Sequence, residues 1–315
     1  MKHKGIVLVP DSPLIVGVST RALFNLEEEH KVFVEQGVEA YAALQLEREN
    51  IALKPGAAFE VVKRLLALNP EGGKRLVDVL LLSQNSPDLS LRAFHSAEHY
   101  QLGISRGSFT SGRSVAPFIA AWNIDLFLSN NDADVRDAVH AGTAAAKLGP
   151  APLEQTEDPM DEVRVALDGD AVVFSPESDT IYKEKGLAGF LDHERQNAQV
   201  PMERGPFGNF LHKLAKLREQ AKRPDGSSRV RIAIVTARNA PAHARVIHTF
   251  RAWGTPADEA HFVGSHEKAP ILKALGAHIF FDDQEKHFLG AAAVVPAGLV
   301  PGPHAADSVV IPASA

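Results

Sequence analysis

Polar side chains gather where three apolar runs in the C-terminal half of this 315-residue chain end. They are four carboxylates and a hydroxyl: Asp168, Asp170, Thr236, Asp282 and Asp283. Ligands of open parallel sheets bind outside the carboxyl ends of the strands, so these groups are expected at one edge of a sheet. Lys268 opens the helical stretch before the third run and could reach the same edge.

Such a cluster predicts phosphoryl transfer. Packed carboxylates repel one another and need a cation, and ligation by oxygen alone selects a hard ion, most simply Mg²⁺. A metal ion, an ammonium group and a nucleophilic carboxylate together supply what phosphoryl transfer needs, because its catalysis is mainly positioning and charge neutralisation. A carboxylate nucleophile splits a difficult hydrolysis into two steps. A second carboxyl group beside it can keep its proton near neutrality, because the first, ionised Asp raises its pKa.

The elements that carry these groups occur twice along the chain. Residues 16–24 are similar to residues 165–174, residues 82–85 to 235–238, and residues 126–130 to 279–283. The same spacing separates Ser83 from Thr236 and Pro117 from Pro270. A repeat of this length indicates two related structural units.

The order of the elements predicts the fold class. Each copy begins with a short β-rich run, Leu14–Val18 or Val163–Leu167, and then alternates amphipathic stretches with further apolar strands. This alternation predicts right-handed crossovers and a parallel sheet that is covered on both faces. We therefore expect an α/β fold of two homologous Rossmann-like units, at residues 1–150 and 151–315, joined by a proline-rich linker at 149–159.

The first copy lacks the acids of the second. At the matching places it has Ser19, Arg21, Ser83, Val115 and Ser129-Asn130. No nucleophilic carboxylate remains there and Val115 cannot hold a phosphate, so residues 1–150 are expected to be catalytically inactive. Arg21, Arg113 and Asn131 could still shape the substrate pocket or an oligomer interface, or only tie loops together.

Four short segments carry a resemblance to a known family. Asp168-Gly-Asp-Ala-Val172 resembles the first motif of haloacid-dehalogenase (HAD)-like phosphohydrolases, and Thr236, Lys268 and Asp282-Asp283 match the other three motifs in order and spacing. Nearly the whole chain is more closely similar to the cytosolic 5′-nucleotidase I family, through residues 19–25, 168–175, 235–238 and 279–284. The resemblance implies a Mg²⁺-dependent enzyme that hydrolyses nucleoside 5′-monophosphates.

The same resemblance implies a role for each motif residue. Asp168 would attack phosphorus and form an aspartyl-phosphate, and Asp170 would protonate the departing 5′-oxygen and then activate water. Thr236 and Lys268 would hold phosphate oxygens. The implied Mg²⁺ ligands are Asp168, the Asp170 carbonyl and Asp282, with Asp283 binding or orienting the ion.

Residues at about 174–222 are expected to form an insertion in the second unit, where the family resemblance implies a small cap over the site. The substrate-binding candidates are Arg238, Phe174, Arg21 and Asn131. Phe174 could stack on a base or belong to the core of the cap, and Arg238 could meet a ligand anion or form an ion pair.

Three other functions stay open. One is a HAD-type phosphatase for another small phosphomonoester such as a sugar phosphate, and one is a nucleotide-binding regulatory protein without turnover. The third is a zinc peptidase, because His95-Ser-Ala-Glu-His99 fits the H-x-x-E-H pattern. That motif lies on an expected helix of the inactive copy, which favours an ordinary helix face.

The composition limits which classes of partner and which location are expected for the protein. A net charge of −6 leaves no basic footprint for a nucleic-acid polymer, and the absence of Cys is compatible with a reducing cytosol. The apolar run at 5–9 is cut by Pro10-Asp11 and no long apolar span follows, so export and membrane insertion are not expected. The expected protein is cytoplasmic, binds a nucleoside monophosphate, and could form a homo-oligomer.

Overall fold

A computed structural model describes residues 12–149 and 161–302 of the chain. The apolar run at 5–9 and nearly all of the linker expected at 149–159 lie outside these residues. The strands of the N-terminal half are β1 (Leu14–Val18), β4 (Val77–Ser83), β5 (Gly107–Phe109), β6 (Leu126–Ser129) and β7 (Ala144–Leu148). Those of the C-terminal half are β8 (Val163–Leu167), β9 (Val230–Thr236), β10 (Glu259–Phe262), β11 (Ile279–Asp282) and β12 (Ala297–Leu299).

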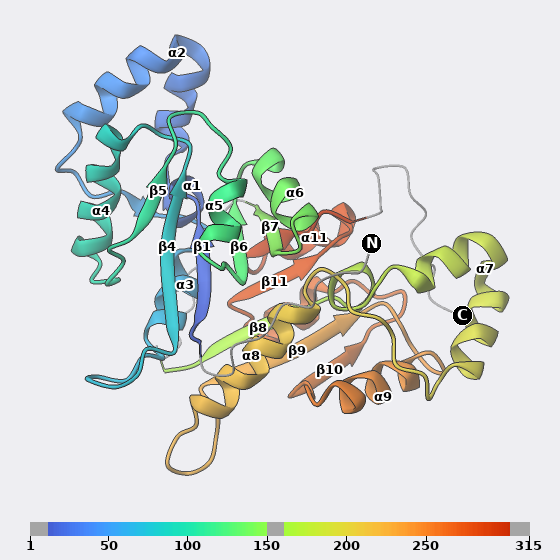
Figure 1. Cartoon of the computed structure of the whole chain (residues 1–315). Helices are drawn as coiled ribbons and strands as arrows, with labels where there is room; N and C mark the ends of the chain where they lie inside the picture. Colours follow the sequence, from blue (N-terminus) through green and yellow to red (C-terminus); the bar gives the residue numbers. More distant parts are fainter. Residues whose placement is uncertain (1–11, 150–160, 303–315) are drawn as a thin grey trace.

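These ten strands form a sheet in the order β10-β9-β8-β11-β12-β7-β6-β1-β4-β5, which runs through the whole molecule (Figure 1). Neighbouring strands described in this sheet are parallel except β7 and β12, which pair antiparallel. The expected α/β fold with a largely parallel sheet is therefore confirmed. A smaller antiparallel pair joins β2 (Phe24–Asn25) to β3 (Lys54–Pro55).

The strands can be apolar on both sides because helices cover both faces of the sheet. The helices of the N-terminal half are α1 (Thr20–Leu23), α2 (Glu27–Glu47), α3 (Phe59–Leu66), α4 (Ser90–His99), α5 (Ala116–Ala121) and α6 (Asp132–His140). Those of the C-terminal half are α7 (Glu177–Gln196), α8 (Gly208–Gln220), α9 (His243–Trp253), α10 (Ala269–Leu275) and α11 (Glu285–Ala292). Successive side chains of a strand point to opposite faces, so Leu126 and Leu128 enter one core while Phe127 enters another.

One core is continuous across the two halves. It contains buried side chains of both, such as Val16, Leu128, Val165 and Phe281. Helix α3 of the N-terminal half contacts β8, and α8 of the C-terminal half contacts β1. The opposite face of the sheet instead has a separate core in each half. The halves are thus packed as one body.

The strand order is the same in each half: β5-β4-β1-β6-β7 and β10-β9-β8-β11-β12. Because β7 and β12 are antiparallel, the strands of one half run opposite to those of the other. The carboxyl ends of β8, β9 and β11 therefore lie at one edge of the sheet, and those of β1, β4 and β6 at the other.

The segment expected as an insertion, residues 174–222, contains two different helices. Helix α8 packs against β9 and β1, as a crossover helix does, whereas α7 projects from the end of the molecule (Figure 1). Helix α7 bends at Gly186, where φ is 66°, and α2 bends likewise at Gly37, where φ is 86°. Glycine adopts these positive φ values without a steric penalty.

None of the helices in the described part of the chain combines the length and the apolar character that crossing a bilayer requires.

Replacing Phe127 by alanine tests the core of the N-terminal half. Phe127 is fully buried on β6, so Phe127→Ala should lower the free energy of unfolding by about 3–5 kcal/mol, measured by urea denaturation. Phe118→Ala is the matched control, because Phe118 is 38% exposed; its change should stay near 0.5 kcal/mol or less. Equal losses for the two variants would contradict this packing.

Candidate active site

Three charged side chains meet at the carboxyl edge of the C-terminal half. Asp168 follows β8, Asp282 ends the adjacent strand β11, and Lys268 stands at the start of α10. The Lys268 Nζ atom lies 2.6 Å from Asp168 Oδ1 and 2.6 Å from Asp282 Oδ2. All three side chains are at least 95% buried. The structure thus brings these sequence-predicted residues into direct contact.

Asp283 joins two of these acids in a group that could hold a metal ion. One carboxylate oxygen from each of Asp168, Asp282 and Asp283 lies within 4.8 Å of the others. Oxygen ligands about 2.1 Å from a Mg²⁺ ion in octahedral geometry are roughly 3–4 Å apart, so the three oxygens suit a hard divalent cation. Within residues 12–149 and 161–302, no other group of His, Asp or Glu side chains converges in this way.

Burial and close charges shift the pKa values of this group. Burial raises the pKa of Asp168 to about 7 although Lys268 opposes the rise. Burial also acts to raise the pKa of Asp282, but Lys268 and His287 outweigh it and hold that pKa below its usual value. The pKa of Asp283 is well above its usual value because of burial and the two neighbouring carboxylates. Burial disfavours the charge of Lys268, yet Asp168 and Asp282 hold its pKa above the usual range.

The Asp170 carboxylate faces a different partner. Arg238 donates from Nε to Asp170 Oδ2 and from Nη2 to Asp170 Oδ1, each over 2.7 Å. The same guanidinium donates to Glu194 Oε2 and Ser178 Oγ, both on α7. Burial acts to lower the pKa of Arg238, but Asp170 and Glu194 raise it above its usual range. The Arg238 side chain therefore forms ion pairs with Asp170 and Glu194, which is one of the two roles expected for it from the sequence.

The turn after Asp168, Gly169–Val173, is wide and not helical, because Asp170 has a ψ of 140° and Ala171 a φ of 58°. In the N-terminal half, the corresponding residues 20–23 form the regular helical turn α1. The second copy has one residue more over this stretch than the first. A non-glycine residue with positive φ is strained by about 1–2 kcal/mol and is maintained only by its surroundings. Here the backbone bonds from Phe174 to Gly169 and from Phe207 to Val172 hold the turn.

Thr236, the last residue of β9, lies beside this turn. Its Oγ1 atom accepts a hydrogen bond of 3.3 Å from the backbone N–H of Arg238. A Cβ atom on Gly169 would stand 3.2 Å from the same Oγ1 atom. The hydroxyl is thus next to the residue that follows Asp168.

The other expected substrate-binding residues lie elsewhere. Phe174 is fully buried and packs on Phe250 and Trp253, so in this structure its ring is part of the core and offers no face to a base. Arg21 forms two hydrogen bonds of 2.9 Å to Glu27, and Asn131 caps α6. Because Arg21 and Asn131 follow β1 and β6, they lie at the opposite edge of the sheet from Asp168. The antiparallel junction of β7 and β12 is the physical reason that they are not brought to the acid cluster.

Several contact residues were not expected from the sequence. Glu194 and Ser178 bind Arg238, and His287 Nδ1 lies 3.5 Å from Asp282 Oδ2. Arg245 binds Glu194 over 3.0 Å. One available signal was the repeat itself, because Arg245 occupies the place that Arg92 has in the first copy.

The H-x-x-E-H motif does not form a metal site among the described residues. His95 Nδ1 lies 3.4 Å from the Glu49 carbonyl oxygen, and the His99 ring packs on Tyr100. The zinc peptidase alternative therefore has no support in the structure.

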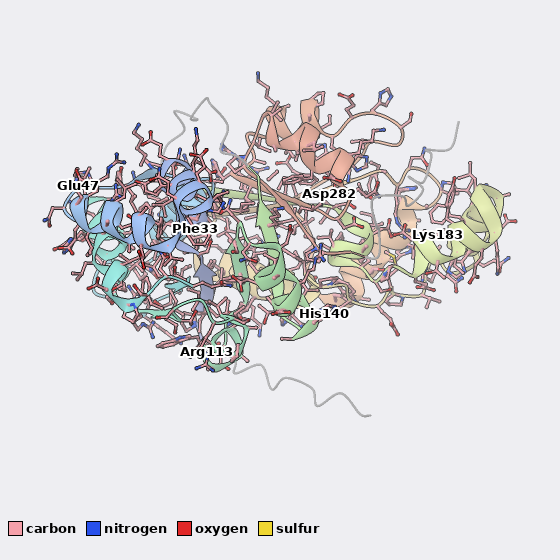
Figure 2. All side chains as sticks on the ribbon, turned by 90° about the horizontal axis from the view of Figure 1, so that it is seen from above. Phe33, Glu47, Arg113, His140, Lys183 and Asp282 are labelled. Carbon is pink, nitrogen blue, oxygen red and sulfur yellow. The ribbon has the colours of Figure 1, made fainter. Side chains whose placement is uncertain are left out.

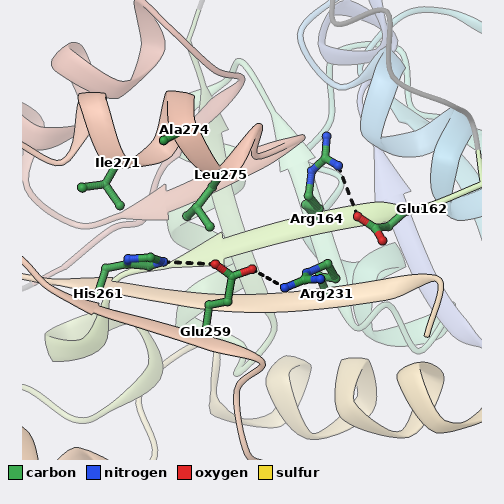
Figure 3. Close-up of a pocket in the computed structure, with 8 residues that line it drawn as sticks. All are labelled: Glu162, Arg164, Arg231, Glu259, His261, Ile271, Ala274 and Leu275. Carbon is green, nitrogen blue, oxygen red and sulfur yellow. Dashed lines mark hydrogen bonds and ion pairs between the residues drawn. The ribbon is translucent and has the colours of Figure 1, made fainter. Parts of the chain in front are cut away.

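A cavity of about 460 Å³ lies at the other end of the strands from the acids (Figure 3). Arg164 and Arg231, near the starts of β8 and β9, are among its lining residues, and Glu259 pairs with Arg231. Four residues of strand, about 13 Å at roughly 3.3 Å per residue, separate Arg164 from Asp168. The cavity is therefore not part of the acid cluster.

The fold and the cluster define an α/β protein with a buried polar site at the carboxyl edge of its sheet, and comparison with known proteins is more specific. The sequence matches the 5′-nucleotidase family over residues 8–307. It is 34% identical over 291 residues to cytosolic 5′-nucleotidase 1B of Homo sapiens, an alignment that covers 90% of this chain and 48% of that protein. The chain belongs to the 5′-nucleotidase family, which confirms the resemblance seen in the sequence. It spans about half the length of this relative.

The similarity to two solved structures is low. A histidinol dehydrogenase from Elizabethkingia anophelis is 9% identical with a TM-score of 0.21, over 76% of this chain and 48% of that one. A putative UDP-N-acetylglucosamine 2-epimerase from Listeria monocytogenes is 9% identical with a TM-score of 0.24, over 91% and 79%. Similarities this low bear on neither fold nor function.

Removing the Lys268 ammonium should destabilise the fold. Lys268→Met leaves Asp168 and Asp282 buried without their cation, which should lower the free energy of unfolding by about 3–5 kcal/mol in EDTA, measured by urea denaturation. The loss should be larger at about pH 8 than at about pH 5, because protonation of Asp168 at low pH removes one of the two charges. Adding Asp282→Asn to Lys268→Met should recover part of the loss. A Lys268→Met protein as stable as the wild type would contradict the ion pairs.

Proposed function

We propose that this chain is a Mg²⁺-dependent 5′-nucleotidase that hydrolyses nucleoside 5′-monophosphates to nucleoside and phosphate. The observation that carries the proposal is the buried contact of Lys268 with Asp168 and Asp282 at the edge of the sheet. Family membership and the name of the human relative support the substrate class. The relative's name also supports a place in the cytosol.

The proposed reaction has two steps. First, an Oδ atom of Asp168 attacks phosphorus, the bond from phosphorus to the 5′-oxygen breaks, and Asp170 gives its proton to that oxygen. Then Asp170 takes a proton from water while the water oxygen attacks phosphorus, the bond to Asp168 breaks, and phosphate leaves. Thr236 and Lys268 would hold phosphoryl oxygens and offset the charge that develops on them.

The acid cluster fits the metal ion that the family resemblance implies. Asp168, Asp282 and Asp283 offer only hard oxygen donors, which suit Mg²⁺. The Asp170 carbonyl is the further proposed ligand. When bound, the ion would neutralise charge on the phosphoryl group and orient it toward Asp168.

We further propose that the fold consists of two homologous HAD-like units, at 1–150 and 151–315, of which only the second is catalytic. The strand order is the same in the two halves, which supports this proposal. Matching hydrogen bonds that occur in both halves, away from the acids, support it as well. Arg92 Nε donates to the Ile51 carbonyl and Arg245 Nε to the Val200 carbonyl, each over 3.0 Å. The Leu53 N–H binds Ser96 Oγ as the Met202 N–H binds Thr249 Oγ1.

The cap of the catalytic unit is proposed to centre on α7, within the insertion at about 174–222. Helix α7 carries the Glu194 and Ser178 side chains that meet Arg238 beside Asp170, so it lies over the site rather than in the sheet. Figure 2 shows Asp282 between Lys183 of α7 and Glu47 of α2, which lie at opposite ends of the molecule. Arg21 and Asn131, at the other edge, are better placed for a homo-oligomer contact than for the pocket.

Phosphate release tests the function. Wild-type protein with Mg²⁺ should release phosphate from AMP or IMP, and Asp168→Asn should abolish the release because an amide cannot attack phosphorus. Ser19→Asn is the matched control: Ser19 holds the corresponding place in the N-terminal half, where it caps α1, and Asn also caps helices well. Release from sugar phosphates alone would replace the nucleotidase by another HAD-type phosphatase. Nucleotide binding without any release would indicate a regulatory protein.

Thermal unfolding tests the metal site separately. Mg²⁺ at about 100 times its dissociation constant should stabilise EDTA-treated protein by about 2.7 kcal/mol, seen as a rise in Tm. Asp282→Asn should remove most of this rise, because it deletes a charged ligand. Asp134→Asn should keep the rise, because Asp134 is also buried but lies in the N-terminal half. A rise that survives Asp282→Asn would place the ion elsewhere.

A further inference from the structure

Arg238 joins the cap helix to a residue of the proposed reaction. Its side chain is 2% exposed and spans two groups: the Asp170 carboxylate on one side, and Glu194 with Ser178 of α7 on the other. A bidentate guanidinium fixes both the position and the plane of a carboxylate. Each Asp170 oxygen keeps a second lone pair for the proton that it moves.

The N-terminal half serves as an internal comparison. There the position of Arg238 is taken by Asn85, that of Asp170 by Arg21, and that of Glu194 by Gln45. Asn85 accepts a hydrogen bond from Tyr41, whose hydroxyl in turn accepts one from Gln45. Asn85, Tyr41 and Gln45 are thus joined by neutral hydrogen bonds, and Arg21 instead forms an ion pair with Glu27 of α2.

A neighbouring arginine shows what is common to both halves. Arg92 binds Gln45 and Glu29 of α2, and Arg245 binds Glu194 and Glu177 of α7. An arginine at this position binds the projecting helix in both halves, although only the C-terminal half carries the acid cluster at its sheet edge. The contact of Arg238 with Asp170 is therefore not needed to dock such a helix, and it occurs in the half that carries the acids.

We propose that Arg238 is a positioning residue that makes the placement of Asp170 depend on the docking of α7. With α7 in place, Glu194 and Ser178 orient the guanidinium, and the guanidinium orients Asp170. Displacement of α7 removes two of the contacts that orient Arg238 and leaves Asp170 without a fixed plane. This inference rests on the proposed function of Asp170 and adds that proton transfer to and from the substrate requires α7 in its docked position.

Arg238→Lys provides the kinetic test, because an ammonium group keeps the charge but cannot span Asp170, Glu194 and Ser178 with a planar fork. With a nucleoside monophosphate, kcat should fall about 10²-fold with little change in KM, as expected for loss of general acid–base catalysis. With p-nitrophenyl phosphate the leaving group needs no proton. Its release should therefore begin with a burst of one equivalent, and the phosphorylated enzyme should accumulate because water is no longer activated.

Arg92→Lys is the matched control, because Arg92 is also buried and also binds two side chains of a projecting helix. It should keep the wild-type ratio of activities on the two substrates. A p-nitrophenol release without a burst for Arg238→Lys, or a higher KM with kcat unchanged, would overturn the proposal; the second result would make Arg238 a substrate-binding residue.

Hydrogen exchange separates this inference from the proposed function. Arg238→Lys should speed amide exchange within α7 (Glu177–Gln196), whereas Arg92→Lys should speed it within α2 (Glu27–Glu47). Unchanged exchange in α7 would disprove the link to the cap whatever the activity. If wild-type protein releases no phosphate from any monophosphate, the proposed function fails, and the exchange result still decides whether Arg238 holds α7.

Discussion

The contact of the Lys268 ammonium with two buried carboxylates is the interaction on which the site depends. A carboxylate removed from water without a partner is costly enough that it takes up a proton instead, and burial already brings the pKa of Asp168 to about 7. Lys268 offsets that cost from the start of α10, where it is 2.6 Å from both Asp168 and Asp282. The strands β8 and β11 must then be neighbours, as the register of Leu167 beside Phe281 makes them.

The second constraint is the direction of the strands. A parallel sheet delivers all its strand ends to one edge, but the antiparallel pairing of β7 with β12 reverses that edge between the halves. The strand ends of the two halves therefore lie at opposite edges of one sheet, which gives two places where a site can form. Only the second carries acids. Ser19 holds the backbone conformation of Asp168, with ψ near 150–160° in both, but uses its side chain to cap a helix.

The sequence was informative about features that depend on a local pattern or that occur in both halves. Apolar runs predicted β1 and β8 with their observed ends, and the repeat placed Asp168, Lys268 and Asp282 at strand or helix ends that meet. The sequence was uninformative about polar contacts between residues that are far apart along the chain. Arg238 meets Glu194, 44 residues away, and Asp170, 68 residues away, and no periodicity marks such partners. The reversal at β7 and β12 also has no local signal, because either direction pairs the same apolar side chains. That reversal puts Arg21 and Asn131 at the edge opposite Asp168, which their positions in the sequence do not indicate.

The two halves share some contacts and differ in others. Contacts that recur in both halves, such as those of Arg92 and Arg245 with a projecting helix, are compatible with any residues at the sheet edge. The differences near Asp170 are one extra residue, a wide turn with Ala171 at positive φ, and Arg238 in place of Asn85. A strained turn and a buried ion pair each carry a free-energy cost that a purely structural role does not require. This particular turn and the Arg238–Asp170 ion pair occur in the half with the acids, which supports the proposed proton transfers at Asp170.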